Sequence, residues 1–444
     1  MSFRQYSKLS TLAMALIAAN SYAVDWKQFD GESITVLLPE HPVTEGIRTL
    51  LPEFEKQTGI DVNIQALAED LYFDRMEVAL RADKGVADAY FVPMDSTAYT
   101  QYTNGLIKSV QPYLNDPDMT DASYDFGDFP EGFVKATQYP AGSPDAGNYA
   151  IPASFEAYIL FYNKQLVDKY LDGKVPQTMD ELIAAAAEVK EESKGRVAGS
   201  VVRGIRSDTI IDTVSGFVYD SWGNRDVNYP QNVWFDGSWA KPQLDNPDIL
   251  RGLTNYAELM KSGPINIQSI DWPDAERVFS QGRAAFFIDA SLFAPGFEDK
   301  KASRVAGNVG YQVIPPVDAN VGSRTAHWMW GLGIPENAQS PGASWYFIQW
   351  MTSKESEMKI GKLHGGAARQ STWTQSEYTS AFPSDYVSAV SEAMKTSKSS
   401  VVFKSGWSEG ALKIVDVIQD IYKGEEPDQA VKPAQEFLKK FANK

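Results

Sequence analysis

Short apolar runs alternate with amphipathic segments, and this alternation constrains the fold of the chain more than any other feature. The apolar residues Ile47, Leu50 and Phe54 follow helical spacing, whereas the neighbouring short runs have strand length. The first expected elements are, in order, a strand at 34–38, a helix between Thr44 and Gly59, a strand at 61–64, a helix at 73–82 and a strand at 88–92. This order is typical of a parallel sheet covered by helices.

A second alternating block begins near Tyr149. In it, Thr178 and Glu181 form the sequence pattern of a capping box that opens a helix to about Glu192. The other expected elements are a strand at 158–162, helices at 164–170, 247–261 and 273–280, strands at 284–288 and 310–314, and a helical tail at 409–441 broken at 424–427. We therefore predict an α/β protein with two lobes.

Composition narrows the function. The chain has 444 residues, which is too long for one ordinary core, and a formal charge of −17 that argues against duplex DNA or anionic lipid as the main partner. It has no cysteine, which removes disulfides, thiolate metal sites and cysteine nucleophiles. With only three histidines, a histidine-rich metal site is not expected. We expect no cofactor and no metal.

The first 23 residues have the pattern of a cleavable secretory signal. Arg4 and Lys8 precede an apolar stretch at 9–19, and Ser21-Tyr22-Ala23 is a small-x-small cleavage site. The stretch is too short to span a membrane. We therefore expect export to a bacterial periplasm as a protein that is not inserted in the membrane.

Sequence motifs for catalysis are missing. The chain has no Gly-x-Ser-x-Gly elbow, no Walker loop, no His-Glu-x-x-His and no Gly-x-Gly-x-x-Gly that opens a helix. A glycosidase needs only a pair of carboxylates, however, and with 58 acidic residues that alternative stays open.

Aromatic residues make up 12% of the chain, and many tryptophans fall outside helical core spacing. Trp328 and Trp330 would share one face of a strand, next to His327. Aromatic faces cover the C–H patches of neutral sugars, so this pair suits either a carbohydrate or simple packing.

The order of these features resembles the extracellular solute-binding protein family 1, the sugar-binding components of bacterial ABC importers and relatives of maltose-binding protein. The resemblance spans nearly the whole chain after the signal and rests on segments 51–62, 87–90, 104–106, 149–152, 161–164, 279–286, 331–335 and 343–355. Segments 287–291, 327–335 and 366–373 look most like the binding proteins for sugar alcohols and small sugars.

The resemblance implies a periplasmic-binding-protein fold of the type II arrangement, with two α/β lobes joined by three hinge crossings. The first lobe is expected at 24–153 plus 289–336 and the second at 154–288 plus 337–444, after a signal peptide at 1–23. The crossings are expected near 153–157, 288–289 and 335–340.

The ligand would lie between the lobes. Acid side chains would accept hydrogen bonds from hydroxyls, Arg369 would donate hydrogen bonds, and tryptophan rings would cover C–H surface. Asp95 and Glu156 match positions where maltose-binding protein uses carboxylates. The expected ligand-binding residues are Glu40, His41, Asp95, Glu156, Trp222, Trp272, Asp289, Trp328, Trp330 and Arg369.

The expected function is capture of a neutral sugar, oligosaccharide or polyol and its delivery to the permease subunits of an ABC importer. The protein would act as a monomer, without catalysis and without nucleic acid. Two alternatives remain: a secreted carbohydrate-active enzyme, and the same fold with an anion, amine or metal chelate as ligand.

Overall fold

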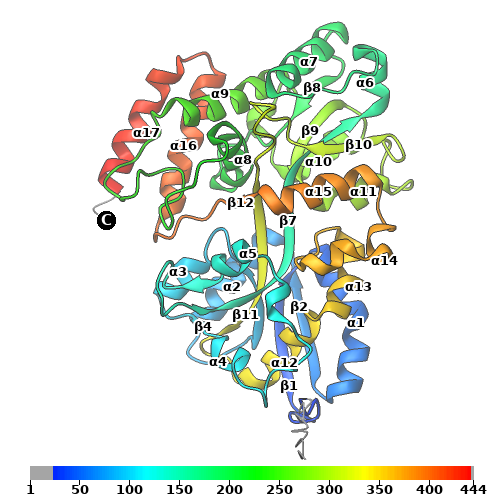
Figure 1. Ribbon diagram of the computed structural model, residues 1–444, viewed down its shortest axis with the longest axis vertical. Helices are drawn as coiled ribbons and strands as arrows, with labels where there is room; N and C mark the ends of the chain where they lie inside the picture. Colours follow the sequence, from blue (N-terminus) through cyan, green and yellow to red (C-terminus); the bar gives the residue numbers. More distant parts are fainter. Residues whose placement is uncertain (1–23, 442–444) are drawn as a thin grey trace, which may run out of the picture.

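The computed structural model describes residues 24–441, and the predicted signal peptide lies outside this range. Figure 1 shows two α/β lobes stacked along the long axis, joined by the long strands β7 and β11. The fold is therefore the predicted α/β arrangement of two lobes.

The first lobe is built around the parallel strands β1, β2 and β3. β11 pairs antiparallel with β3, and the first half of β7 pairs antiparallel with β11 and so runs in the direction of β1–β3. Its elements are β1 (Ser33–Pro39), α1 (Pro42–Thr58), β2 (Asp61–Leu67), α2 (Glu69–Leu80), β3 (Ala89–Pro93), α3 (Ala98–Thr103), β4 (Ile107–Lys108), α4 (Gln111–Leu114), α5 (Glu131–Ala136), β5 (Gln138–Tyr139), β6 (Gly147–Asn148), β7 (Ala150–Asn163), β11 (Ala326–Pro335), α12 (Pro341–Met351), α13 (Lys354–His364) and α14 (Ser376–Thr379).

The second lobe surrounds the other half of β7, which pairs with β9 and β10, while β8 extends the sheet beyond β9. Its elements are α6 (Lys164–Leu171), α7 (Met179–Glu192), β8 (Ala198–Val201), α8 (Ile211–Trp222), α9 (Pro247–Lys261), α10 (Trp272–Ser280), β9 (Ala284–Ala290), α11 (Ala294–Glu298), β10 (Val309–Val313), α15 (Ser384–Thr396), β12 (Lys398–Ser399), α16 (Trp407–Tyr422) and α17 (Pro427–Phe441).

Local chemistry explains where the first helices begin and end. The predicted cap of α1 was wrong: His41 is the cap and accepts a hydrogen bond from the Val43 N–H, whereas the Thr44 hydroxyl donates to the Pro39 carbonyl. Gly59 ends α1 with a φ of 74°, in the left-handed region that favours glycine. The predicted N-cap of α7 is confirmed, because Thr178 accepts from the Glu181 N–H, but the Glu181 carboxylate accepts from the Gln177 N–H and so does not close the box on Thr178.

Strand β7 is far longer than predicted and forms the spine of the molecule. Its first half was not predicted as a strand, and Pro152 lies within it. The register with β11 shifts there, because Trp330 pairs with Ser154 and Gly331 pairs with Pro152, which leaves Ala153 as an extra residue. Such a bulge is where a sheet tolerates proline.

The predicted lobe boundaries were wrong after Asp289. Strand β9 does not leave the second lobe, because Ile288 and Asp289 still pair with Leu160 and Ile159 of β7. β10 pairs with the same half of β7, so the segment before β11 stays in the second lobe. Helices α12 and α13 pack against α1 and belong to the first lobe.

Three crossings join the lobes. The chain passes along β7 at Ala157 and Tyr158, where pairing with β11 gives way to pairing with β9. It returns at the start of β11, where the Thr325 hydroxyl donates to the Tyr158 carbonyl at 2.9 Å. The third crossing lies between α14, which packs on α13, and α15, which packs on β10. We call the region where β7 and β11 pass between the lobes the junction.

Candidate functional site

Strand alternation places a polar and an aromatic row side by side at the junction. Ser154, Glu156 and Tyr158 alternate along β7, so they share one face of the strand. Trp328 pairs directly with Glu156 across the two strands, and Trp330 pairs with Ser154. Cross-strand partners project from the same face, so Glu156 stands beside the Trp328 ring.

His41 and Glu156 form the best-defined polar pair of this face. His41 Nε2 lies 3.2 Å from Glu156 Oε1, and both side chains are largely buried. Because Nδ1 accepts from the Val43 N–H, the proton of the neutral ring is on Nε2, which donates to Glu156. His364 lies 6.5 Å from the His41 ring, and burial, with His41 as a lesser cause, lowers its pKa to about 3.

Glu69 and Asp95 add carboxylates from the first lobe. Burial is the main cause that raises the pKa of Glu69, and the charge of Glu156 raises it further. Two groups of the second lobe also act on Glu69: Arg203 lowers its pKa and Asp271 raises it. Asp95 follows β3 and accepts from the Met329 N–H at 2.7 Å and from the Ser399 hydroxyl. Burial raises its pKa from 3.8 to about 7 despite these hydrogen bonds.

The second lobe contributes an ion pair. Arg203 follows β8, and its Nε donates to Asp289 Oδ2 at 2.8 Å while Nη2 donates to Oδ1. Burial alone would lower the pKa of this guanidinium, but the Asp289 carboxylate more than offsets that effect, so the pKa is raised. A bidentate pair of this kind holds both side chains in a fixed orientation.

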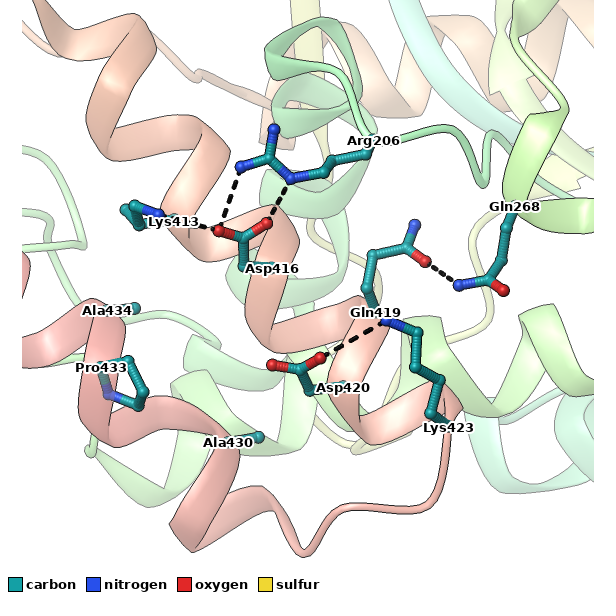
Figure 2. A pocket seen from close by; sticks show the side chains of 10 residues that line it. All are labelled: Arg206, Gln268, Lys413, Asp416, Gln419, Asp420, Lys423, Ala430, Pro433 and Ala434. Atoms are coloured by element: carbon teal, nitrogen blue, oxygen red, sulfur yellow. Dashed lines mark hydrogen bonds and ion pairs between the residues drawn. The ribbon is translucent and has the colours of Figure 1, made fainter.

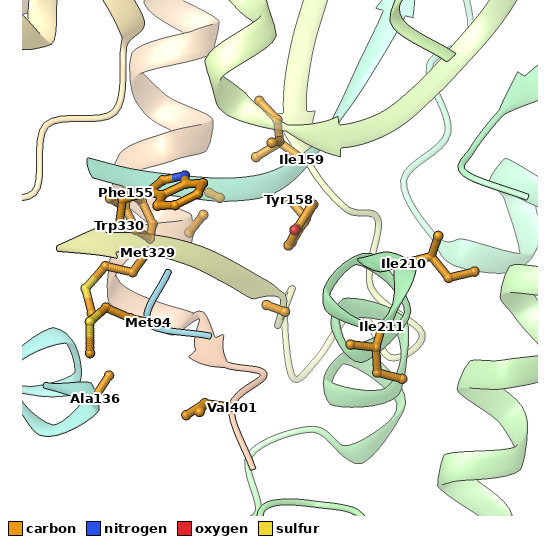
Figure 3. Packing of buried hydrophobic residues seen from close by; sticks show 14 of the residues in the cluster. Met94, Ala136, Phe155, Tyr158, Ile159, Ile210, Ile211, Met329, Trp330 and Val401 are labelled. Atoms are coloured by element: carbon orange, nitrogen blue, oxygen red, sulfur yellow. The ribbon is translucent and has the colours of Figure 1, made fainter. Parts of the chain in front are cut away.

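The two junction tryptophans differ in what they can offer. Trp330 is 2% exposed and lies flat against Phe91, with ring centroids 4.9 Å apart and an interplanar angle of 0°. Phe73 and His41 lie about 6 Å from the same ring. Trp328 is half-buried and meets Trp330 edge-on. Figure 3 shows Trp330 packed beside β7 and β11, with Tyr158 between β7 and the start of α8.

The structure gives the other predicted site residues contacts of their own. Glu40 is exposed and pairs with Arg48 at 3.3 Å, and Trp272 is half-buried with its ring 5.9 Å from Phe293. Trp222 ends α8, roughly 15 Å along that helix from its first turn, and the Arg225 guanidinium covers its ring at 3.9 Å.

Arg369 is fully buried in the first lobe, not in the second lobe where it was predicted. Its guanidinium donates to the carbonyls of Thr352, Asp125 and Tyr124 at 2.8, 2.8 and 2.9 Å. Those carbonyls, together with Asp128 at 3.5 Å, occupy four of the five guanidinium N–H groups. The side chain therefore ties the 124–128 loop to α12.

Sequence reasoning did not single out Glu69 or Arg203. Ligand residues were sought at the carboxyl ends of parallel strands. Glu69 lies just beyond β2, whose end at Leu67 was placed three residues too early, and Arg203 follows β8, which was not predicted. A prediction that ended β2 at Leu67 and included β8 would have placed both residues just after strands.

A separate cavity of about 550 Å³ lies in the second lobe, lined by residues of α16, α17 and two loops (Figure 2). Its charged groups pair with one another: Arg206 and Lys413 both contact Asp416, at 2.6 and 3.1 Å, and Lys423 contacts Asp420. These charges compensate each other, unlike the excess of acids at the junction.

Residues 24–441 contain neither a membrane-spanning helix nor a cluster of metal-binding side chains. No helix in this range is long and apolar enough to cross a membrane. No group of three or more histidine, aspartate or glutamate side chains in the same range is arranged to hold a metal ion.

The sequence is similar to those of two bacterial proteins named as binding proteins for sugar alcohols. The erythritol/L-threitol-binding protein of Mycolicibacterium smegmatis is 29% identical over 412 residues, which cover 90% of this chain and 84% of the relative. The mannitol-binding protein of Pseudomonas aeruginosa is 26% identical over 245 residues, about half of each chain.

Solved structures share the fold. An ABC transporter solute-binding protein from Agrobacterium radiobacter in complex with ribitol has a TM-score of 0.76 at 23% identity, covering 93% of this chain and 99% of that one. Another from Thermotoga lettingae, bound with α-D-tagatose, has a TM-score of 0.77 at 21% identity, covering 93% and 100%. The profile described as "Bacterial extracellular solute-binding protein" matches residues 40–358, well over half of the sequence. The chain therefore belongs to the bacterial extracellular solute-binding protein family.

Proposed function

We propose that this protein binds a small neutral polyol at the junction and delivers it to the permease of an ABC importer. The observation that carries the proposal is the convergence of ionisable groups from both lobes. Glu69 of the first lobe lies within the electrostatic field of Glu156 and His41 and also of Arg203 and Asp271 from the second lobe. A ligand held there would contact both lobes at once.

The charge balance of the junction favours a neutral ligand over an organic acid. Glu69, Glu156, Asp95 and Asp289 supply carboxylates, and the guanidinium of Arg203 is already paired with Asp289. Another anion would meet repulsion there, because like charges in a poorly solvated site disfavour each other. Hydroxyl groups can instead donate hydrogen bonds to the carboxylates.

The two tryptophan rings at the junction leave little free surface on which a ligand could stack. The Trp330 ring packs on Phe91, and of the junction pair only Trp328 is partly open. A pyranose needs an aromatic face for its C–H patches, whereas an open-chain polyol is recognised mainly through hydroxyl groups. The binding proteins for erythritol, L-threitol and mannitol among the relatives support a polyol of four to six carbons.

Capture by closure of the lobes sets an energy requirement on the ligand contacts. Micromolar binding corresponds to about 8 kcal/mol, and shifting lobe closure from 1:99 to 99:1 takes about 5.5 kcal/mol of differential affinity. Most ligand contacts must therefore form only when both lobes engage the ligand. The closed protein would then present surfaces of both lobes to the permease as a monomer.

A ligand screen tests the proposal. Thermal unfolding is measured with erythritol, ribitol, mannitol, tagatose, maltose, simple amines and organic acids, and hits are confirmed by calorimetry. At 100 times its dissociation constant a polyol should stabilise the protein by ~2.7 kcal/mol. Stabilisation by acids or amines alone would overturn the ligand class. Release of new reducing ends from oligosaccharides would support the enzyme alternative.

Export to the periplasm is tested separately. We expect the protein purified from the periplasm of its host to begin at Val24, after removal of residues 1–23. Intact mass spectrometry measures this directly. An unprocessed chain that starts at Met1 in the cytoplasmic fraction would contradict the proposed location.

A further inference from the structure

Several polar atoms at the junction are buried without a hydrogen-bond partner. Ser154 Oγ on β7 and Thr213 Oγ1 on α8 have none in the described part of the chain. Tyr158 is 1% exposed as a residue, and no hydrogen bond of its hydroxyl is found within residues 24–441, although this oxygen is not one of the fully buried unpaired atoms. Buried polar groups in native proteins are nearly always paired, so such a cluster calls for a partner that is not part of the fold.

Asp212 in the first turn of α8 has a hydrogen bond to only one of its two carboxylate oxygens among the described residues. Its side chain is buried, and the Ser400 hydroxyl donates to Oδ1. No donor among the described residues reaches Oδ2. Asp220, two turns later on the same helix, differs: its Oδ2 accepts from the Val317 N–H at 2.7 Å and its Oδ1 from the Arg324 N–H at 3.3 Å.

Tyr158 and Asp212 are neighbours. After burial, Asp212 is the largest influence that raises the pKa of Tyr158, and Arg203, Asp289 and Glu156 act on the same hydroxyl. Burial likewise raises the pKa of Asp212, followed by the charge of Asp95. The phenol is therefore a neutral donor, and Figure 3 shows the Tyr158 ring on the side of β7 that faces Ile210 and Ile211 at the start of α8, the residues just before Asp212.

We propose that the Tyr158 hydroxyl and Asp212 Oδ2 bind adjacent hydroxyl groups of the ligand, so that β7 and α8 form the second-lobe half of the site. This inference rests on the proposed polyol function. A vicinal diol fits the pair, because one hydroxyl can accept from Tyr158 while its neighbour donates to Asp212. Glu156 and His41 would take the other end of the ligand in the first lobe.

Conservative variants test the assignment. Tyr158→Phe removes only the unpaired hydroxyl, and Asp212→Asn keeps the shape of the side chain. Each should weaken the binding of erythritol, ribitol or mannitol, whichever binds the wild type most tightly, by at least tenfold in calorimetry. Tyr158→Phe should not lower the melting temperature of the free protein, because no protein hydrogen bond is lost.

Matched controls separate binding from folding. Asp220→Asn changes a buried carboxylate whose oxygens both have backbone donors, and Tyr346→Phe removes a buried hydroxyl that donates to Gln28 at 2.8 Å. Both controls should lower the melting temperature and leave affinity within twofold of wild type.

The outcomes are distinct. If the wild type binds a polyol and both junction variants bind it within twofold of wild type, the assignment is wrong while the proposed function stands, and ordered water then fills the site. If no polyol binds the wild type, the proposed function fails and the diol assignment fails with it. A tenfold loss in the junction variants but not in the controls supports the assignment.

Discussion

Two aromatic clusters of this molecule use the same side chains in different surroundings. The junction cluster consists of Phe73, Phe91, Trp328 and Trp330, with the His41 ring against it. The outlying cluster joins the 234–239 loop to α16 and the end of α17 and consists of Trp234, Phe235, Trp239, Trp407 and Phe441. Both contain buried tryptophan rings, and the composition of the sequence does not distinguish them.

Their polar neighbours do distinguish them. The junction cluster stands beside Glu156 and His41, which are held in a hydrogen bond. Among the described residues, the cation over the rings of the outlying cluster is Lys404, which lies 5.6 Å from the Trp239 ring and 5.4 Å from the Phe441 ring. The indole N–H groups of Trp234 and Trp407 lack a hydrogen-bond partner in the described part of the chain. Ionisable neighbours, rather than aromatic content, distinguish the proposed ligand site from the outlying cluster.

Truncating the largest buried ring of each cluster should have the largest effect. Trp330→Ala and Trp234→Ala should each lower the free energy of unfolding by about 3–5 kcal/mol, because both rings are almost fully buried. Urea unfolding measures this loss. The packing of Trp330 on Phe91 makes the ring part of the core of the first lobe. If Trp330→Ala lowered the free energy of unfolding by less than 1 kcal/mol but greatly weakened ligand binding, Trp330 would be a ligand contact and not a core residue.

The pH dependence of stability should differ between the two regions. The pKa of Asp95 rises on folding from 3.8 to about 7, so its contribution to stability is complete below pH 3.8 and is lost as the pH rises to 7. Asp95→Asn does not titrate. Its stability relative to wild type should therefore increase by about 2–4 kcal/mol between pH 4 and pH 7.

The control for this titration comes from the outlying cluster. Trp234→Phe should lower stability by a similar amount at every pH, because no carboxylate contacts that ring among the described residues. Unfolding in urea at several pH values checks both variants. A constant difference between Asp95→Asn and wild type across pH 4–7 would contradict the raised pKa of Asp95.

Removing the charge of the polar row should affect binding more than folding. Glu156→Gln keeps the shape of the side chain and a partner for His41 but removes the carboxylate. A hydrogen bond from a ligand hydroxyl to a charged acceptor contributes about 1.5–3 kcal/mol, so affinity for the best polyol should fall by roughly 10- to 100-fold. Calorimetry measures this change. Unchanged affinity would remove Glu156 from the site.

The partly open rings give the smallest contrast. Trp328→Ala should weaken polyol binding by about tenfold, since its half-buried ring stands opposite Glu156. Trp239→Ala, which removes a half-buried ring of the outlying cluster, should leave affinity unchanged. Equal effects of the two substitutions would mean that the two clusters do not differ in function.

Periodicity predicted most elements, because amphipathic helices and short buried strands leave local patterns. Helix α9 at Pro247–Lys261 and the start of α7 after Thr178 lie where expected. The lobe boundaries could not be predicted in this way, because they depend on which strands pair. Nothing local in Ile288-Asp289 shows that these residues pair with β7 and stay in the second lobe.

The candidate site was predictable only in part. Asp95 and Glu156 follow from strand ends and from the resemblance, and the structure places both at the junction. The sequence could not show that the Trp330 ring stacks on Phe91 or that the Arg369 guanidinium donates to backbone carbonyls. These partners lie far away in the chain. Tyr158 and Asp212 were not singled out, because a polar atom without a hydrogen-bond partner is visible only in three dimensions.

A structure of the protein crystallised with the polyol that binds it most tightly tests the central claim most directly. The account predicts ligand density between the lobes, with hydroxyl oxygens within hydrogen-bond distance of Glu156 in the first lobe and Tyr158 in the second. Polyol bound instead in the cavity between α16 and α17, with the junction empty, would contradict it.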